Sequence, residues 1–274
     1  MRAQNLTVSI PPGNILCDKN CPYCVSRMTG YMETNIRLVF KNVPKVKTLA
    51  QNAQVTNVLL TGKGEPTLNR PDLMWLLREF RHYPIELQTN GINLSADFQY
   101  LEDLAENGLN VLAVSIDNIG QFTSLYELFA RSKELGMLTR ATVNITGWIS
   151  KEMTFYDFID LCRAGSVDQL MLRQIVVPNY VEADSATAKW INENVDPEQY
   201  DRLFNEMKDA CTVRGRFLRQ LHFGPGVYDY KGVSVSYSDY CIQDSNEGED
   251  IRSLIFLEDG HLYTSWNSTA SAIL

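Results

Sequence analysis

Short runs of apolar and β-branched residues recur along the first two thirds of the chain, the last five starting 26–29 residues apart. Runs of this length and composition are typical of buried strands. The five begin at Asn57, Ile85, Val111, Thr139 and Asp168, and an earlier run covers Leu6 to Ile10. The pattern therefore predicts six strands before Pro178.

Between these runs, apolar residues lie three and four positions apart, which predicts amphipathic helices. One such face comprises Leu73, Leu76, Leu77 and Phe80, and another comprises Leu125, Leu128, Phe129 and Leu135. Ser95 is expected to start a helix, and Gly108 and Gly136 to end two helices. Strands and helices that alternate in units of about 30 residues predict a parallel sheet. Six units are too few for the closed eight-stranded barrel, so a doubly wound sheet and a partly closed barrel both stay open.

After Pro178 the alternation stops. Residues 186–210 are expected to form one or two helices, with a new start at Asp196-Pro197. Strands are expected over Val227–Tyr237 and, with a turn inside it, over Leu254–Trp266.

The chain has 274 residues, of which 45% are hydrophobic, and a net charge of −8 from 25 Lys+Arg and 33 Asp+Glu. This apolar fraction is enough for a full core and excludes a disordered chain. The acidic balance gives no general attraction to nucleic acid or to an anionic membrane, so neither is an expected partner. No apolar run is long enough to span a bilayer, and Met1–Asn5 lacks the pattern of a signal peptide, so we expect a cytoplasmic protein.

Three of the six cysteines fall within eight residues, at Cys17, Cys21 and Cys24. Thiolates are ligands of iron–sulfur clusters and of zinc, and such clustering favours a metal or redox site over disulfides. Structural zinc requires four ligands, and the next candidate, His82, is remote in the sequence. Three thiolates on a four-iron cluster leave one iron open for chemistry. The octet favours the cluster, and a zinc site completed by a distant residue is the alternative.

Polar motifs end three of the later strands. Thr61–Pro66 (TGKGEP) follows the second strand, Gln88–Gly91 (QTNG) the third and Ser115–Asp117 (SID) the fourth. Together with the CxxxCxxC octet, they resemble in order and position the motifs of the radical S-adenosylmethionine (SAM) superfamily. The resemblance covers about residues 6–178. It implies an α/β fold, a partial (β/α)6 TIM-like barrel, with a C-terminal α+β extension.

The resemblance also implies a role for each matching residue. Cys17, Cys21 and Cys24 would hold a [4Fe-4S] cluster whose open iron binds SAM. The implied SAM contacts are Tyr23 near adenine, Gly64 and Glu65 at the amino group, Asn90 in the TNG motif, Ser115 and Asp117 at the ribose, Asn144 at the ribose or carboxylate, and Arg173 or Arg140 at the carboxylate. A carboxylate beside an ammonium group is a favourable pairing.

The reaction implied by the resemblance is radical chemistry. Supplied with an electron, such an enzyme cleaves SAM to methionine and a 5′-deoxyadenosyl radical, which abstracts hydrogen from the substrate. We expect a small-molecule substrate (a nucleotide, sugar or amino-acid derivative) and an electron donor such as flavodoxin or ferredoxin. Within the family, the alternative is a peptide or protein substrate that docks on a strand edge near residues 227–237. The alternative from another class is a zinc-stabilised α/β binding protein without catalysis.

Two parts are expected: the barrel core at residues 1–178, and an extension at residues 179–274 that lines or caps the substrate site. In the extension, Arg214, Arg216 and Arg219 either bind a phosphate or carboxylate or form the solvated basic face of a helix.

The other three cysteines are scattered. Cys162 lies on a helical apolar face and is expected in the core. Cys241 is a candidate hydrogen-atom donor to a substrate radical, with a buried structural cysteine as the alternative. Because Cys211 and Cys241 have no companions, no auxiliary cluster is expected, which argues against subfamilies that carry one, including the molybdopterin-pathway cyclase. Trp266 is expected to serve packing.

Overall fold

The computed structural model describes residues 1–274 except 31, 179–180, 239–245, 248–249 and 267. The six predicted strands are β1 (Arg2–Ser9), β2 (Val58–Thr61), β3 (Ile85–Thr89), β4 (Val111–Ile116), β5 (Leu138–Ile145) and β6 (Gln169–Gln174). They pair in chain order, and every neighbouring pair is parallel. The predicted parallel sheet is therefore confirmed.

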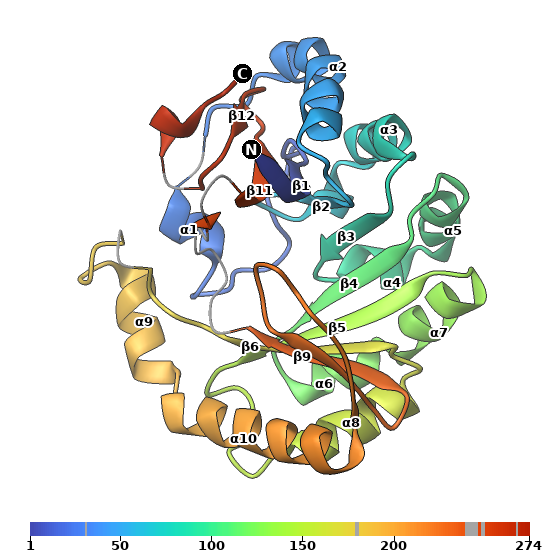
Figure 1. Ribbon diagram of the computed structural model, residues 1–274, viewed down its shortest axis with the longest axis vertical. Helices are drawn as coiled ribbons and strands as arrows, with labels where there is room; N and C mark the ends of the chain where they lie inside the picture. The colour runs from blue at the N-terminus through green and yellow to red at the C-terminus, as the bar shows by residue number, and fades with distance from the viewer. Residues whose placement is uncertain (31, 179–180, 239–245, 248–249, 267) are drawn as a thin grey trace.

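Helices cover the outer face of this sheet (Figure 1). The longer ones are α2 (Ile36–Asn52), α3 (Arg70–Phe80), α5 (Phe98–Glu106), α7 (Tyr126–Glu134) and α8 (Phe155–Ala164). Shorter helices follow the first four strands in the chain: α1 (Val25–Thr29), η1 (Pro66–Leu68), α4 (Ile92–Ala96) and α6 (Ile119–Ser124). The predicted apolar face of α3 is fully buried. Gly108 and Gly136 follow α5 and α7 with φ of +100° and +83°, a conformation that glycine adopts at low cost.

Two details of the helices differ from expectation. Asp97 caps α5, because its carboxylate accepts the Tyr100 N–H at 3.0 Å, whereas Ser95 lies inside α4. Ser95 is therefore not the start of that helix. The sequence pattern also does not predict α2, whose internal Pro44 and many polar residues obscure an apolar face that is nevertheless buried.

The extension contains two helices and six strands among the described residues. They are α9 (Ala186–Asn194), α10 (Pro197–Arg214), β7 (Arg216–Gln220), β8 (Gly226–Tyr230), β9 (Val233–Ser238), β10 (Asn246–Glu247), β11 (Asp250–Phe256) and β12 (Leu262–Tyr263), followed by η2 (Thr269–Ser271). Asp196 caps α10 and Pro197 is its first residue, which confirms the predicted helix start.

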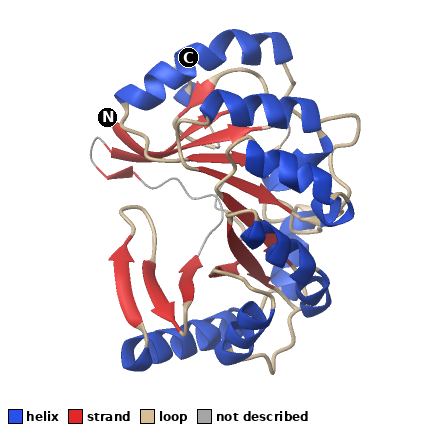
Figure 2. Cartoon of the chain, turned by 90° about the vertical axis from the view of Figure 1, so that its right-hand side faces the viewer, coloured by secondary structure: helices blue, strands red, loops and turns tan. Residues whose placement is uncertain are grey.

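Two strands of the extension lengthen the parallel sheet, one at each edge. β9 pairs with β6 and β11 pairs with β1, both in parallel. The parallel part therefore runs β11-β1-β2-β3-β4-β5-β6-β9, with antiparallel strands beyond both ends. Figure 2 shows the strands β7–β9 next to α10, at one end of the molecule. The predicted fold class, a partial barrel with an α+β extension, is confirmed.

The free edge of the sheet is not at residues 227–237. β8 lies between β7 and β9, and β9 lies between β6 and β8. The outermost described strand at this end of the sheet is β7, and all five of its residues are exposed; β10 is outermost at the other end. Arg216 and Arg219 lie on this strand and Arg214 ends α10, so the interpretation of the three arginines as one helical face is wrong.

One apolar core joins the extension to the barrel. It includes the fully buried Leu6 of β1, Val235 of β9 and Leu254 of β11, and the predicted core residue Cys162 of α8. Among the described residues, no helix combines the length and the apolarity that crossing a bilayer requires.

Candidate active site

A cavity of about 340 Å³ collects residues from the carboxyl ends of the parallel strands. Because these ends meet at one edge of the sheet, motifs that follow different strands come together there. The predicted site residues that line it are Cys17, Cys21, Tyr23, Cys24, Gly64, Glu65, Asn90, Ser115, Asp117, Asn144 and Arg173. Cys241 lies outside the described residues.

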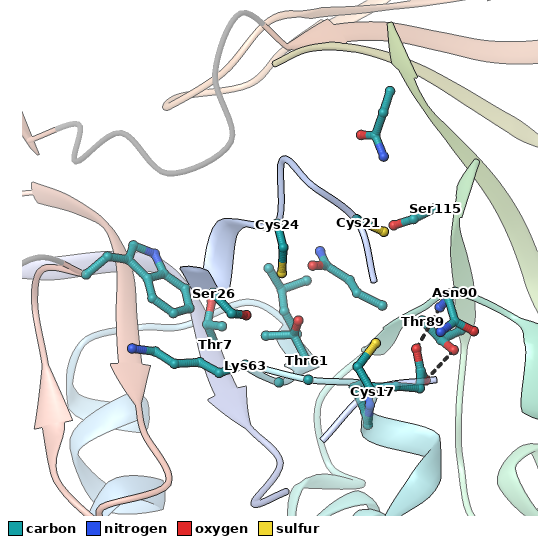
Figure 3. Close-up of a pocket in the computed structure, with 18 of the residues that line it drawn as sticks. Thr7, Cys17, Cys21, Cys24, Ser26, Thr61, Lys63, Thr89, Asn90 and Ser115 are labelled. Atoms are coloured by element: carbon teal, nitrogen blue, oxygen red, sulfur yellow. Dashed lines mark hydrogen bonds between the residues drawn. The ribbon is translucent and has the colours of Figure 1, made fainter. Parts of the chain in front are cut away.

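The cysteine loop connects β1 to α1, and its three thiols point into this cavity (Figure 3). The Cys24 N–H donates to the Cys21 carbonyl at 3.2 Å, which forms the turn into α1. The backbone N–H of Lys19 donates to Cys17 Sγ at 3.4 Å. Burial raises the pKa of the Cys17 thiol, and raises that of Cys21 to about 11. Iron must therefore displace protons when these thiols become ligands.

The donors fit a cluster better than a single ion. Around one tetrahedral zinc, sulfur atoms are about 3.8 Å apart, given Zn–S bonds of about 2.3 Å. No three of the described His, Cys, Asp or Glu side chains are placed to bind one metal ion. Wider spacing is expected when each thiolate binds a different iron. Asn144 Oδ1 and Arg173 Nε are also buried without hydrogen-bond partners among the described residues, as expected of atoms that face a bound ligand.

The second motif packs directly on the cysteine loop. A Cβ on Gly64 would lie 1.9 Å from the carbonyl oxygen of Leu16, the residue before Cys17. The same oxygen accepts the Glu65 N–H at 2.8 Å. Glycine is therefore required by this contact between two loops, since the approach leaves no room for a side chain.

Glu65 joins the end of β2 to the end of β3. Its Oε1 accepts from the Thr67 backbone (3.1 Å) and the Thr67 hydroxyl (2.7 Å). The same oxygen accepts from the Thr89 hydroxyl at 2.6 Å, and its Oε2 accepts the Asn90 N–H at 2.8 Å (Figure 3). Burial raises the pKa of the Glu65 carboxyl, and these hydrogen bonds oppose that shift. Asn90 in turn donates to Asp18 in the cysteine loop at 2.6 Å.

Asp117, at the end of β4, is bonded from several sides. Its Oδ1 accepts from the Tyr23 hydroxyl and from Asn144 Nδ2, the latter at 2.9 Å. Its Oδ2 forms an ion pair with Lys19. Its backbone N–H donates to Gln121 Oε1 at 2.9 Å. The next helix is capped by Asn118, so Asp117 is not its cap.

Tyr23 is held by aromatic contacts as well as by Asp117. Its ring centroid lies 5.6 Å from that of Trp148 and 5.2 Å from that of Trp190, which belongs to α9 of the extension. Desolvation by burial, with the nearby Asp117 charge, raises the pKa of the Tyr23 hydroxyl, which therefore remains a donor. The aromatic cluster fixes this wall of the cavity.

The two arginines expected near the SAM carboxylate differ in whether they face the cavity. Arg140 forms an ion pair with Glu86 at 2.6 Å, donates to Gln169 at 2.8 Å and does not line the cavity. The Arg140 guanidinium is therefore neutralised by Glu86 and does not face the cavity. Arg173 lines the cavity and has no ion-pair partner among the described residues.

Several residues of the cavity wall were not predicted. Asn5 and Thr7 alternate with the buried Leu6 and Val8 of β1, and this period-two pattern was the available signal. Lys19 lies within the cysteine octet and Lys63 within the TGKGEP motif, but their contacts with the cavity depend on the fold and are not visible in the sequence. Trp266 also lines the cavity in addition to packing.

A protein-family model described as the radical SAM superfamily matches residues 15–141. Residues 15–141 of this chain thus carry a radical SAM domain. Enzymes of this superfamily use a [4Fe-4S] cluster and SAM, so the match confirms the predicted family and its cofactor pair at the level of this domain.

One curated protein is similar to this chain in sequence, and solved structures of another are similar to it in fold. GTP 3',8-cyclase of Clostridium acetobutylicum is 31% identical over 234 residues, which cover 84% of this chain and 61% of the cyclase. Crystal structures of SuiB of Streptococcus suis, bound to its precursor peptide SuiA or to SAM, superpose with TM-scores of 0.62 and 0.61 at 14% identity. These superpositions cover 95% of this chain and 59% or 60% of SuiB, and they show the fold. The chain thus spans about three fifths of the length of each relative.

Proposed function

We propose that this protein cleaves SAM reductively and uses the resulting radical to abstract hydrogen from a small-molecule substrate. The supporting observation is that the cysteine octet and the polar residues at the strand ends line one cavity. When bound and reduced, the [4Fe-4S] cluster supplies the electron that splits SAM into methionine and the 5′-deoxyadenosyl radical.

The residues of the chain would bind the cluster and SAM and orient them. Cys17, Cys21 and Cys24 hold the cluster and leave one iron without a protein ligand. Asp117 and Asn144, linked to each other, and Ser115 would bind the ribose. Tyr23 would face the adenine.

The remaining assignments concern the amino-acid end of SAM. Arg173 is available to pair with the carboxylate, since no described residue neutralises its guanidinium. Glu65 and Gly64 would lie at the amino group, and Asn90 fixes the loop beside them through Asp18.

The substrate would lie beside SAM in this cavity, whose volume of about 340 Å³ is that of a small-molecule site. The extension contributes Ser253, Ile255, Thr264 and Trp266 to its wall. The name of the cyclase relative favours a nucleotide among the candidate substrates, although the lack of companions for Cys211 and Cys241 argues against the reaction of that cyclase itself. The peptide alternative has less support, because the free edge strand β7 contributes no residue to the cavity. The electron donor would be flavodoxin or ferredoxin.

The test is anaerobic reconstitution with iron and sulfide, followed by dithionite and SAM, with 5′-deoxyadenosine measured by mass spectrometry. The wild type should hold about four irons per chain and produce 5′-deoxyadenosine, whereas Cys24→Ala should lose at least 100-fold, that is ~3 kcal/mol of barrier. Cys211→Ser, remote from the cavity, is the control and should stay active. A chain that binds one zinc and never cleaves SAM would disprove the proposal.

A further inference from the structure

Lys19 places a positive charge inside the cysteine loop, two residues after Cys17. Its ammonium group forms an ion pair with Asp117 Oδ2, and Gln121 Oε1 lies 3.5 Å from the same nitrogen. The Lys19 side chain is 21% exposed and that of Asp117 only 4%. The pair is therefore largely shielded from water, where charges act more strongly on their neighbours than at a surface.

The carboxylate that Lys19 neutralises stands beside a cluster ligand. Asp117 Oδ2 lies 3.9 Å from Cys21 Sγ. The donors to its other oxygen, Tyr23 and Asn144, are neutral. Among the described residues, no cation other than Lys19 lies within ion-pair distance of Asp117. Without Lys19, a full negative charge would thus face the sulfur of Cys21.

Lys19 also acts on a second ligand sulfur through its backbone. Its N–H donates to Cys17 Sγ at 3.4 Å. Hydrogen bonds to sulfur and the net charge near a cluster both set its reduction potential. Both contacts of Lys19 favour the state with the extra electron.

We propose that Lys19 raises the reduction potential of the cluster held by Cys17, Cys21 and Cys24, because it cancels the charge of Asp117 beside Cys21. This inference rests on the proposed function, since it requires the cluster. One electron enters the cluster, and no proton is transferred with it. The residue tunes the metal centre without being a ligand.

The experiment measures the potential of the reconstituted cluster by an EPR-monitored redox titration without SAM. Lys19→Met keeps the length of the side chain and should shift the potential to a more negative value. Asp117→Asn should shift it to a more positive value, and the double variant should lie between the two. Lys19→Arg keeps the charge and should titrate close to the wild type. Lys41→Met, at an exposed position on α2, is the matched control and should leave the potential unchanged.

Iron content, measured on every variant, separates tuning from simple damage to the loop. A fully loaded Lys19→Met that titrates at the wild-type potential overturns the inference, as does Asp117→Asn without a positive shift. If Lys19→Met loads poorly, Asp117→Asn and Lys19→Arg still decide the question. A wild-type chain that binds no cluster would instead remove the proposed function itself.

Discussion

At Gly64, the motif after β2 meets Leu16, 48 positions earlier in the chain, with no space for a side chain between them. The contact is made by the backbone of Leu16, so it fixes where the cysteine loop begins. A glycine in this motif is thus explained by packing as much as by the turn. Changing it tests whether the two loops must touch for the cluster to be held.

We predict that Gly64→Ala destabilises the fold by about 1–3 kcal/mol, the usual cost of overpacking, and lowers iron incorporation several-fold. The added methyl group would meet the Leu16 carbonyl oxygen at 1.9 Å and push the loop away. Thermal unfolding and iron content after reconstitution measure the two effects. Gly120→Ala is the control, because the nearest atom there is the Asn118 side chain at 3.3 Å. Normal iron content in Gly64→Ala would refute the requirement.

Much of the site was predictable at the level of single residues. To predict that the cysteine triad and the motifs after β2, β3 and β4 lie in one site, only one rule is required: the carboxyl ends of parallel strands meet at one edge of the sheet. The pairing of Lys19 with Asp117 was not predictable, since it joins residues 98 positions apart through side-chain geometry. The ion pair of Arg140 was not predictable for the same reason, because its partner Glu86 is on another strand.

Among the elements, α8 begins with a complete capping box. The Thr154 side chain accepts the Asp157 N–H, and the Asp157 carboxylate accepts the Thr154 N–H at 2.8 Å and its hydroxyl at 2.7 Å. This reciprocal capping satisfies two backbone donors that the helix would otherwise leave free. The hydrogen bonds from Thr154 lower the pKa of the Asp157 carboxyl.

We predict that Asp157→Asn lowers the free energy of unfolding by about 0.5–2 kcal/mol at neutral pH, as the loss of a cap does. Because the folded-state pKa of Asp157 is depressed, its contribution is present above the unfolded pKa of about 3.9 and is lost as pH falls through the folded value. Denaturant unfolding across this range should show the two proteins converge at low pH. A difference that stays constant with pH would contradict this account.

Elements with a clear period were predictable, and those without one were not. The strands β1–β6 are apolar runs in a regular series, whereas β7 (RFLRQ) is exposed along its whole length and therefore carries no burial pattern. The edge at β7 could not be foreseen either, because strand order within the extension is set by tertiary contacts.

At the scale of the whole molecule, the extension is part of the barrel. Leu254 of β11 is completely buried in the same core as Leu6 of β1, although the two are far apart in the chain. In the parallel pairing of β1 with β11, Leu6 lies directly opposite Leu254. The stability of the barrel should therefore depend on β11.

We predict that Leu254→Ala destabilises the protein by about 2–5 kcal/mol, the cost of emptying a buried leucine site. Leu138→Ala, at a position that is 48% exposed, is the control and should change stability by about 0.5 kcal/mol or less. Thermal or denaturant unfolding gives both values. Equal effects of the two substitutions would show that β11 is only loosely attached.

The pairing of β1 with β11 also has a consequence for biosynthesis. At about 5–20 residues per second, a ribosome needs roughly 12–50 s to add the residues between these strands. During that time the outer edge of β1 has no partner, and a bare strand edge is a template for wrong pairing. Slower translation should lengthen this exposure, so the yield of soluble protein is expected to depend on elongation rate and on chaperones that shield the nascent chain.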